Sequence, residues 1–221
     1  VFEAGGQRIG VTICEDIWQP GPVEETVEAG ATLILNLNAS PFHQGKAVER
    51  KNQVRARIAA TRVPLAYINL VGGQDELVFD GHSFVMNREG ACTHQAPAFE
   101  ETTLVVEFHK GPTPQPIPGN KAATLSKEAE IYQALTTGIR DYVKKNGFKG
   151  ALLGLSGGID SALTLALAVD ALGKDQVEAV LLPSRYTADM SNEDALLEVA
   201  ALGCKHHIIP IEPAFQTFLD L

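Results

Sequence analysis

The sequence GALLGLSGGIDSALTLALA spans Gly150–Ala168 and decides the fold of the second half of the chain. The apolar run Ala151–Leu155 stops at Ser156–Gly158, and a second apolar run with helical periodicity begins at Ile159. This order predicts a buried strand, a tight turn and a helix. Glycines let backbone N–H groups converge on an anion, and the positive end of the helix faces the same point. The stretch therefore predicts an anion site in an α/β fold.

The residues around this turn favour a phosphate group with a divalent cation. Ser156 and Ser161 supply hydroxyl donors, whereas the Asp160 carboxylate repels phosphate unless a cation such as Mg²⁺ lies between them. The lysine of a Walker A loop is absent. SGGIDS instead resembles the pyrophosphate-binding loop of the ATP pyrophosphatases, the PP-loop family, which implies ATP and Mg²⁺ as cofactors. The alternative is a glycine turn of any doubly wound sheet.

Composition places the chain among soluble globular proteins. Its 221 residues suit one large or two small domains, with 45% hydrophobic and 20% charged residues. A net charge of −9 without a lysine or arginine cluster argues against a nucleic-acid groove. Three cysteines do not make a disulfide framework. No apolar run has the length of a membrane span. We therefore expect a cytoplasmic protein with no nucleic-acid or membrane partner.

Alternating apolar runs and turns divide the first half of the chain. Lys110–Asn120 holds four prolines and two glycines, so we expect a linker there. Gly72–Glu76 follows the third expected strand. The expected strands are Arg8–Ile13, Thr32–Leu37, Pro64–Val71, Ser83–Met86, Ala91–Gln95 and Thr103–Phe108, and the expected helices are Val23–Ala29 and Gly45–Thr61.

The second half alternates between strands and helices. Such a βαβαβ order predicts a parallel sheet. We expect helices over Ser126–Asn146, from Ile159 to about Leu172, over Ser191–Leu202 and from Pro213, strands over Ala151–Leu155, Val177–Leu182 and His207–Ile211, and a loop over Pro183–Thr187.

A cysteine follows the first buried strand directly. Cys14 lies where the strand gives way to a turn and then a helix. A thiol at such a bend suits a nucleophile, because the following backbone N–H groups can stabilise an oxyanion. A lone cysteine is more often a small buried hydrophobic residue. Local sequence alone leaves both interpretations open.

Longer motifs favour the nucleophile. GVTICEDIW, LNASPFHQGK and YINLVGGQDELVFDGHSFV resemble, in this order, the glutaminase half of the glutamine-dependent NAD synthetase family. GLSGGIDSALTLALAVDALG and LPSRYTADMSNEDA resemble its synthetase half. The resemblance implies the C-terminal part of a nitrilase-like α-β-β-α sandwich. The start of a doubly wound parallel-sheet domain of the adenine nucleotide α hydrolase-like type then follows. We expect the glutaminase part over residues 1–109, a linker over 110–125 and the PP-loop part over 126–221.

The resemblance also implies roles for individual residues. Cys14 attacks glutamine, the Glu15 N–H contributes to the oxyanion hole, and Trp18 forms a wall of the glutamine pocket. Ser40 and Lys46 hold the amino-acid end of glutamine. The implied ATP site comprises Gly154, Leu155, Ser156, Gly157, Gly158, Ile159, Asp160, Ser161, Leu182, Ser184 and Arg185, with Asp160 also at the metal.

The implied reaction is the ATP- and glutamine-dependent amidation of deamido-NAD to NAD through an adenylated carboxylate. Its partners are glutamine, deamido-NAD and ATP, and we expect a homo-oligomer. The family's glutamate base and lysine lie upstream of the cysteine strand. The 13 residues before Cys14 contain no lysine, and Glu3 does not match the base. We therefore expect an incomplete chain. The alternatives are another PP-loop amidotransferase, such as GMP or asparagine synthetase, whose glutaminase is built differently, and a catalytically incomplete nucleotide-binding fragment.

The remaining polar and cysteine residues have simpler interpretations. We expect Cys92 and Cys204 to be packing residues, and His206-His207 to be structural because metal-ligand spacing is absent. Histidines in loops are more often polar surface than functional groups. The expected surface set comprises His43 and His82 together with Arg50, Arg55, Arg57 and Arg62 on a solvated helix face, for which a subunit contact is the alternative.

Overall fold

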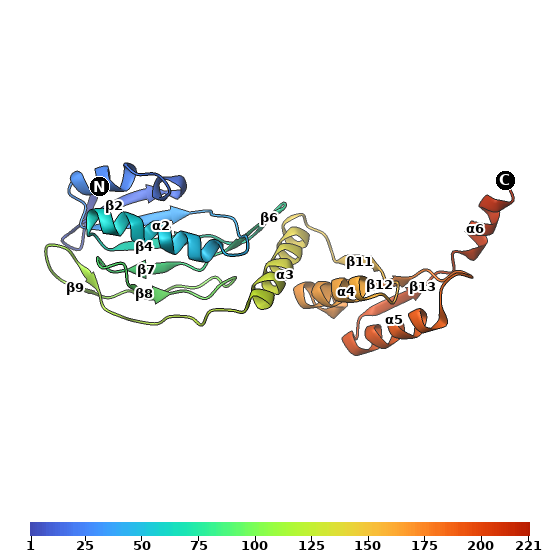
Figure 1. The fold of residues 1–221 in the computed structure, drawn as a ribbon. Helices are drawn as coiled ribbons and strands as arrows, with labels where there is room; N and C mark the ends of the chain where they lie inside the picture. Colours follow the sequence, from blue (N-terminus) through green and yellow to red (C-terminus); the bar gives the residue numbers. More distant parts are fainter. The chain divides into compact units, whose positions relative to one another are not determined.

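The computed structural model describes residues 1–221, which form two compact units (Figure 1). The first unit comprises Val1–Gly72 with Glu76–Ala134, and the second comprises Gly73–Asp75 with Leu135–Leu221. The division falls within helix α3, Lys127–Lys145. At the start of this helix, the Ser126 hydroxyl accepts the Ala129 N–H at 3.2 Å. None of the helices combines the length and apolarity that a membrane crossing requires.

A six-stranded mixed sheet organises the first unit. Its strand order is β1-β2-β3-β4-β7-β8, with β2, β3 and β4 parallel and the other neighbours antiparallel. The parallel centre confirms the predicted α/β arrangement of the early strands. The strands are β1 Phe2–Ala4, β2 Gln7–Ile13, β3 Leu33–Asn38, β4 Leu65–Asn69, β7 Phe84–Met86 and β8 Cys92–Gln95.

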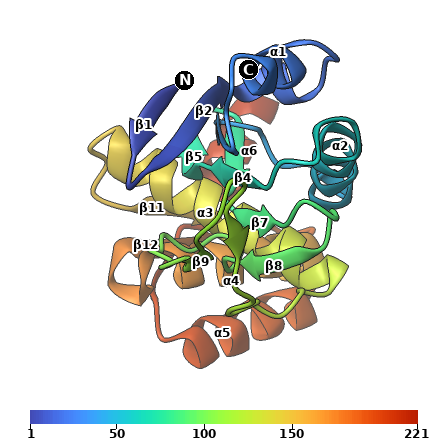
Figure 2. The same ribbon diagram turned by 90° about the vertical axis from the view of Figure 1, so that its left-hand side faces the viewer.

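Two helices cover one face of this sheet, as Figures 1 and 2 show for α1, Pro22–Glu28, and α2, Lys46–Thr61. Proline at the first position of α1 suits a helix start, because its missing N–H would have no helical partner there. Apolar side chains of the helices and the strands form one core: Ile17, Val23, Ala31, Ile34, Val54, Ile58, Val63, Leu65, Tyr67, Phe84 and Met86.

The opposite face of the sheet carries an apolar hollow of about 580 Å³. Leu35, Ala66 and Val85 occupy one register row across three strands and line it. Segment 103–108 also lines the hollow but forms no strand before Phe108, so the predicted strand Thr103–Phe108 is wrong. Alternating apolar residues indicate which side faces inward, but they do not supply a neighbour for hydrogen bonding.

A hairpin lies over Val71–Asp80, where the sequence predicts no strand beyond Val71. β5, Val71–Gln74, pairs with β6, Leu77–Asp80, and the predicted strand Pro64–Val71 ends as β4 before this hairpin begins. Asp75 adopts a left-handed φ of 52° in the two-residue turn. Asp tolerates that conformation better than most residues, so the glycines extend the strand and the aspartate makes the turn.

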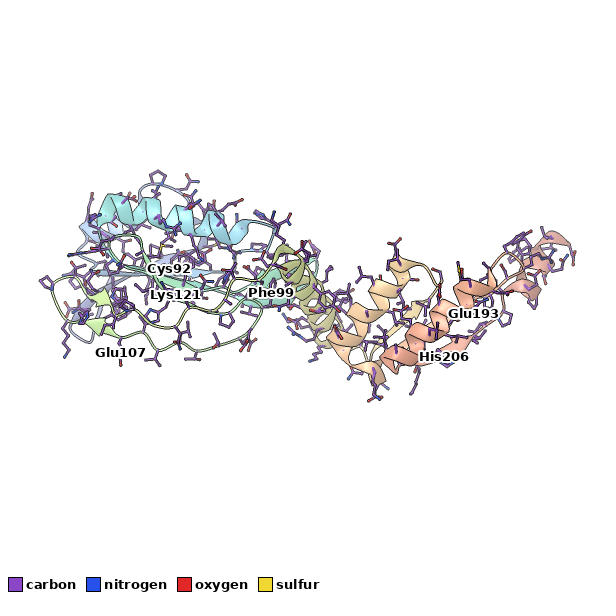
Figure 3. The ribbon with its side chains drawn as sticks, turned by 60° about the horizontal axis from the view of Figure 1, so that its bottom comes forward. Cys92, Phe99, Glu107, Lys121, Glu193 and His206 are labelled. Carbon is purple, nitrogen blue, oxygen red and sulfur yellow. The ribbon has the colours of Figure 1, made fainter.

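The proline-rich segment after the sheet contains one short pairing. β9, Phe108–His109, and β10, Gln115–Pro116, are antiparallel, which corrects the expectation that no strand forms within Lys110–Asn120. The chain then runs beside β8, where the Gln95 N–H donates to the Asn120 carbonyl at 3.1 Å. Figure 3 labels Cys92 and Lys121 on these two segments.

A three-stranded parallel sheet organises the second unit. Its order is β11-β12-β13, with β11 Ala151–Gly154, β12 Val177–Leu181 and β13 Lys205–Ile208, so the predicted βαβαβ unit is confirmed. The last strand begins at Lys205, two residues before the predicted start at His207. Lys205 and His206 are polar residues of an exposed edge strand, so an apolar pattern does not reveal them. Figure 3 labels His206 on β13.

Two helices pack on this sheet through apolar stripes. They are α4, Ile159–Leu172, and α5, Asp189–Leu202, and the chain ends with α6, Glu212–Leu219. Short 3-10 helices lie at Cys14–Ile17 (η1) and Lys174–Gln176 (η2). The core comprises Leu155, Leu165, Ala168, Val177, Ala179, Leu181, Ala195, Val199 and Cys204. Cys204 is therefore a packing residue, as predicted.

Candidate functional sites

Cys14 lies at a sharp bend between β2 and η1. Its φ is 46°, in the left-handed region that non-glycine residues seldom adopt, and such strain concentrates at functional sites. The Asp16 carboxylate accepts the backbone N–H of Ile13 at 2.7 Å and so holds the bend from the far side. The thiol is half-buried and forms no disulfide. Cys14 therefore lies at the bend between strand and helix that the sequence predicts, and its role as a nucleophile stays a prediction.

Two other residues of the predicted glutamine site lie together. The Lys46 ammonium is 4.1 Å from the centre of the Trp18 ring, a cation–π contact between α2 and the end of η1. Lys46 also pairs with Glu49 at 3.3 Å on the exposed side of α2. Trp18 packs on the core of the first unit, whereas Glu15 is exposed. A cation on a fixed aromatic ring suits a carboxylate partner.

Ser40 lies in a buried polar cluster at the end of β3. Arg50 is 1% exposed and its Nη1 donates to both Asp80 oxygens at 2.8 Å. Its Nε donates to Ser40 Oγ at 3.1 Å, and its Nη2 donates to the Ser40 carbonyl at 2.7 Å. The expectation that Arg50 lies on a solvated helix face is therefore wrong. Arg50 occurs four residues before Val54 and eight before Ile58, so it shares their buried stripe.

Asn69 and Tyr67 complete the surroundings of Ser40. Asn69 Oδ1 accepts the Ser40 N–H at 2.9 Å, while its Nδ2 donates to the Ser40 carbonyl at 3.3 Å. The fully buried Tyr67 hydroxyl lies beside Ser40, yet it makes no hydrogen bond of good geometry. Burial raises the pKa of Tyr67, the nearby Ser40 opposes this rise, and the Cys14 thiol adds to it. Tyr67 thus lies within electrostatic reach of the serine and the cysteine.

A second buried chain of polar groups lies on the same unit. Lys51 Nζ donates to Gln95 Oε1 at 2.5 Å, and Gln95 Nε2 donates to His82 Nε2 at 2.5 Å. Burial lowers the pKa of Lys51 and that of His82. His82 is buried with a φ of 55°, so the expectation of a polar surface histidine is wrong. His43 is exposed, as predicted.

Other arginines and histidines make ordinary surface pairs. Arg57 contacts Glu24 at 3.1 Å, and Arg55 is exposed. His207 lies 2.8 Å from Glu178 on the neighbouring strand. No group of three or more His, Cys, Asp or Glu residues is arranged to hold a metal ion. A structural role for the histidine pair stays a prediction.

The turn after β11 has the strand–glycine turn–helix geometry expected from the sequence, and its role as an anion cradle stays a prediction. Gly157 has a φ of 78°, and a Cβ there would overlap the backbone carbonyl of Ser191, so the turn requires glycine. Ser156 Oγ and Ser161 Oγ lie 3.0 Å apart at the start of α4, and the Gly158 N–H donates to Ser156 Oγ at 3.3 Å. The first N–H groups of a helix have no helical partner, so this end offers donors to an anion.

These residues fit a nucleotide phosphate with Mg²⁺. Asp160 is exposed in the first turn of α4, and Mg²⁺ usually takes one or two carboxylates together with substrate phosphates. A single carboxylate beside hydroxyl and N–H donors supplies that combination. Gly154, Leu155 and Ile159 frame the cradle at the end of β11 and the start of α4.

The loop after β12 lies at the same edge of the sheet, because β11 and β12 are parallel neighbours. Leu182 is 48% exposed, and the Ser184 N–H donates to Thr187 Oγ1 at 3.0 Å. Arg185 pairs with Glu212 and donates to Gln216 Oε1 at 2.9 Å. The hydrogen bond from Arg185 lowers the pKa of Glu212, and this carboxylate raises the pKa of Arg185. The guanidinium thus faces a carboxylate in this conformation.

Two parts of the chain match two families of known proteins. Residues 1–111 match the carbon-nitrogen hydrolase model, and the chain belongs to this family. Residues 131–221 match the NAD synthase model. A carbon-nitrogen hydrolase unit followed by the start of an NAD synthase unit confirms the predicted fold class.

Relatives that match along nearly the whole chain carry both units. The glutamine-dependent NAD(+) synthetase of Xylella fastidiosa is 45% identical over 99% of this chain, and that of Xanthomonas campestris is 47% identical over the same share. The structure of glutamine-dependent NAD+ synthetase from Acinetobacter baumannii, in complex with ADP, matches 100% of the chain with a TM-score of 0.93 and 42% identity. The resemblance predicted from the motifs is confirmed. The chain spans 40% of the length of these two curated relatives and 42% of that solved chain.

Proposed function

We propose that the complete protein containing these residues is a glutamine-dependent NAD synthetase that converts deamido-NAD to NAD. A single observation carries the proposal: one chain holds both a strained cysteine turn and a glycine turn suited to phosphate, and it matches glutamine-dependent NAD(+) synthetases along nearly its whole length. The proposed substrates are glutamine, deamido-NAD and ATP. A differently built glutaminase belongs to the GMP and asparagine synthetases, so the carbon-nitrogen hydrolase match disfavours them.

In the first unit the proposed reaction is glutamine hydrolysis. The Cys14 sulfur attacks the side-chain amide carbon, the backbone N–H groups after it stabilise the oxyanion, and ammonia leaves. Water then cleaves the thioester to glutamate. We propose that Lys46 and Ser40 hold the amino-acid end of glutamine, which the contact of Lys46 with Trp18 and the fixed orientation of Ser40 support. None of the residues before Cys14 matches the glutamate base that the resemblance implies.

In the second unit the proposed reaction is adenylation. The nicotinate carboxylate of deamido-NAD attacks the α-phosphorus of ATP and releases pyrophosphate, and ammonia then displaces AMP from the adenylate. Ser156, Ser161 and the N–H groups at the start of α4 bind phosphate, and Asp160 holds the cation. Mg²⁺ would neutralise the phosphate charge there. The ADP named in the structure of the Acinetobacter baumannii relative supports a nucleotide site.

The remaining proposals concern organisation. We propose a glutaminase part over residues 1–109, a linker over 110–125 and a PP-loop part over 126–221. The two family matches, which end and begin at residues 111 and 131, support this division. A cytoplasmic location and a homo-oligomeric complete protein are also proposed.

Mass spectrometry of the products tests this function. The complete protein is given deamido-NAD, ATP, Mg²⁺ and glutamine labelled with ¹⁵N in the side-chain amide. The proposal predicts labelled NAD with one AMP and one pyrophosphate for each molecule formed. Xanthosine monophosphate and aspartate, offered in place of deamido-NAD, should give no amidated product. Formation of ADP and phosphate instead of AMP and pyrophosphate, or an absence of NAD, contradicts it.

A further inference from the structure

Arg50 connects a buried charge pair to the loop that carries Ser40. One guanidinium donates to Asp80, to the Ser40 hydroxyl and to the Ser40 carbonyl, and its Nη2 also lies 3.1 Å from the Pro41 carbonyl. Asp80 is the last residue of β6, whereas Ser40 follows β3, so the arginine joins two separate parts of the fold. Three of these four partners belong to the turn that leads to Lys46.

Stability alone is a weak reason for this arrangement. Removing an arginine and an aspartate from water costs several kcal/mol for each ion, and replacing buried ion pairs by apolar residues is often neutral or stabilising. The guanidinium group instead contributes hydrogen bonds of defined direction. Its planar donors engage several acceptors in fixed directions, and lysine cannot reproduce that pattern.

The direction of one hydrogen bond links Arg50 to substrate binding. Arg50 Nε donates to Ser40 Oγ, so the serine oxygen acts as an acceptor on that side. A hydroxyl carries one donor and two acceptor lone pairs, and its hydrogen is then free to point away from the arginine. Asn69 fixes the Ser40 backbone from the other side. The serine is thereby held in one orientation before any ligand binds.

We propose that Arg50, neutralised by Asp80, is a positioning residue that orients Ser40 for the substrate of the cysteine site. This inference rests on the proposed function, because it takes glutamine as that substrate. Arg50 acts through Ser40 and touches no reacting atom. Its loss should weaken glutamine binding more than the chemical step, because the nucleophile turn at Cys14 has its own support from Asp16.

The test uses Arg50→Lys in the complete protein. The expected result is a KM for glutamine about tenfold higher, since several charge-assisted hydrogen bonds to one loop are lost, with kcat changed about twofold or less. Ammonia-driven synthesis should be unchanged. A purely structural role would lower the folded fraction, which reduces kcat and leaves KM constant. Arg57→Lys is the matched control, because it lies on the same helix and contacts only Glu24 among the acidic groups.

A second pair of variants keeps the test decisive. If Arg50→Lys does not fold, Arg50→Met combined with Asp80→Leu removes both charges and should still raise the KM. Ser40→Ala combined with Arg50→Lys should raise the KM no more than Ser40→Ala alone, because both changes act on one contact. An unchanged KM in the arginine variants, or an equal rise in Arg57→Lys, overturns the inference. A parent protein without glutamine-driven synthesis refutes the proposed function instead.

Discussion

Asp160 is an exposed carboxylate beside a cradle of neutral hydrogen-bond donors. Ser156, Ser161 and the start of α4 all attract phosphate, whereas a carboxylate by itself repels it. The arrangement becomes favourable when a cation lies between the two negative groups. Asp160 is therefore expected to act through its negative charge. Replacing its carboxylate by an amide of the same shape removes the charge and leaves the shape unchanged.

Asp160→Asn should lower ammonia-driven kcat/KM for ATP at least tenfold and raise the Mg²⁺ concentration needed for half-maximal rate. Supplying ammonia in place of glutamine measures the reaction of the second unit alone in the complete protein. Asp175→Asn is the control, because Asp175 is an exposed aspartate just before the start of β12. This variant should leave the kcat/KM for ATP and the half-maximal Mg²⁺ concentration unchanged. Equal ATP and Mg²⁺ dependence in the Asp160 variant and the parent would rule out a metal role.

At the scale of elements, the turn between β11 and α4 depends on one glycine. Gly157 combines a φ of 78° with a position at which an added Cβ would overlap the backbone of Ser191 on α5. A side chain there would have to move a helix as well as adopt a strained backbone. The cradle is therefore fixed by packing between two helices and the sheet.

Gly157→Ala should reduce ammonia-driven synthesis at least tenfold and lower the free energy of unfolding by about 1–3 kcal/mol. Gly147→Ala is the matched control, because its φ of 72° carries the same strain but nothing lies within 4 Å of the added Cβ. Denaturant unfolding and initial rates of both variants measure the difference. Equal effects in the two variants would mean that the contact with Ser191 does not shape the cradle.

Periodicity and turn residues predict most elements of this fold. α4 was predicted from Ile159 to about Leu172, as observed, and the three parallel strands of the second unit follow from the βαβαβ order. Segment 103–108 and the β5–β6 hairpin could not be predicted. Pairing depends on which strand lies alongside, and a glycine pair followed by Gln-Asp-Glu resembles a loop as well as a hairpin.

Residues of the candidate sites can be predicted where the proposed chemistry requires a particular residue type. They are harder to predict where packing selects one of several similar residues. Cys14, Ser40 and Asp160 occur in motifs with a chemical reason for each residue type. Arg50 is one of four arginines in Arg50–Arg62, and only its spacing from Val54 indicates that it faces inward. His82 is buried by a left-handed turn that its sequence does not reveal.

At the scale of the whole molecule, we propose two separate chemistries for the two units. The first unit carries the cysteine turn and the buried polar cluster, and the second carries the phosphate cradle. Under the proposed function, glutamine and ammonia provide independent access to the second reaction. A change confined to the first unit should affect only the route that begins with glutamine.

The most direct measurement compares glutamine-driven and ammonia-driven NAD synthesis in the complete protein carrying Cys14→Ala. The account predicts that glutamine-driven synthesis falls below one-thousandth of the parent rate, roughly the contribution of a catalytic nucleophile, while ammonia-driven synthesis stays within about twofold of the parent rate. Circular dichroism and thermal unfolding of the variant should match the parent. Retained glutamine-driven synthesis, or loss of both activities in a folded variant, would contradict the assignment of Cys14 as the nucleophile of a separate glutaminase unit.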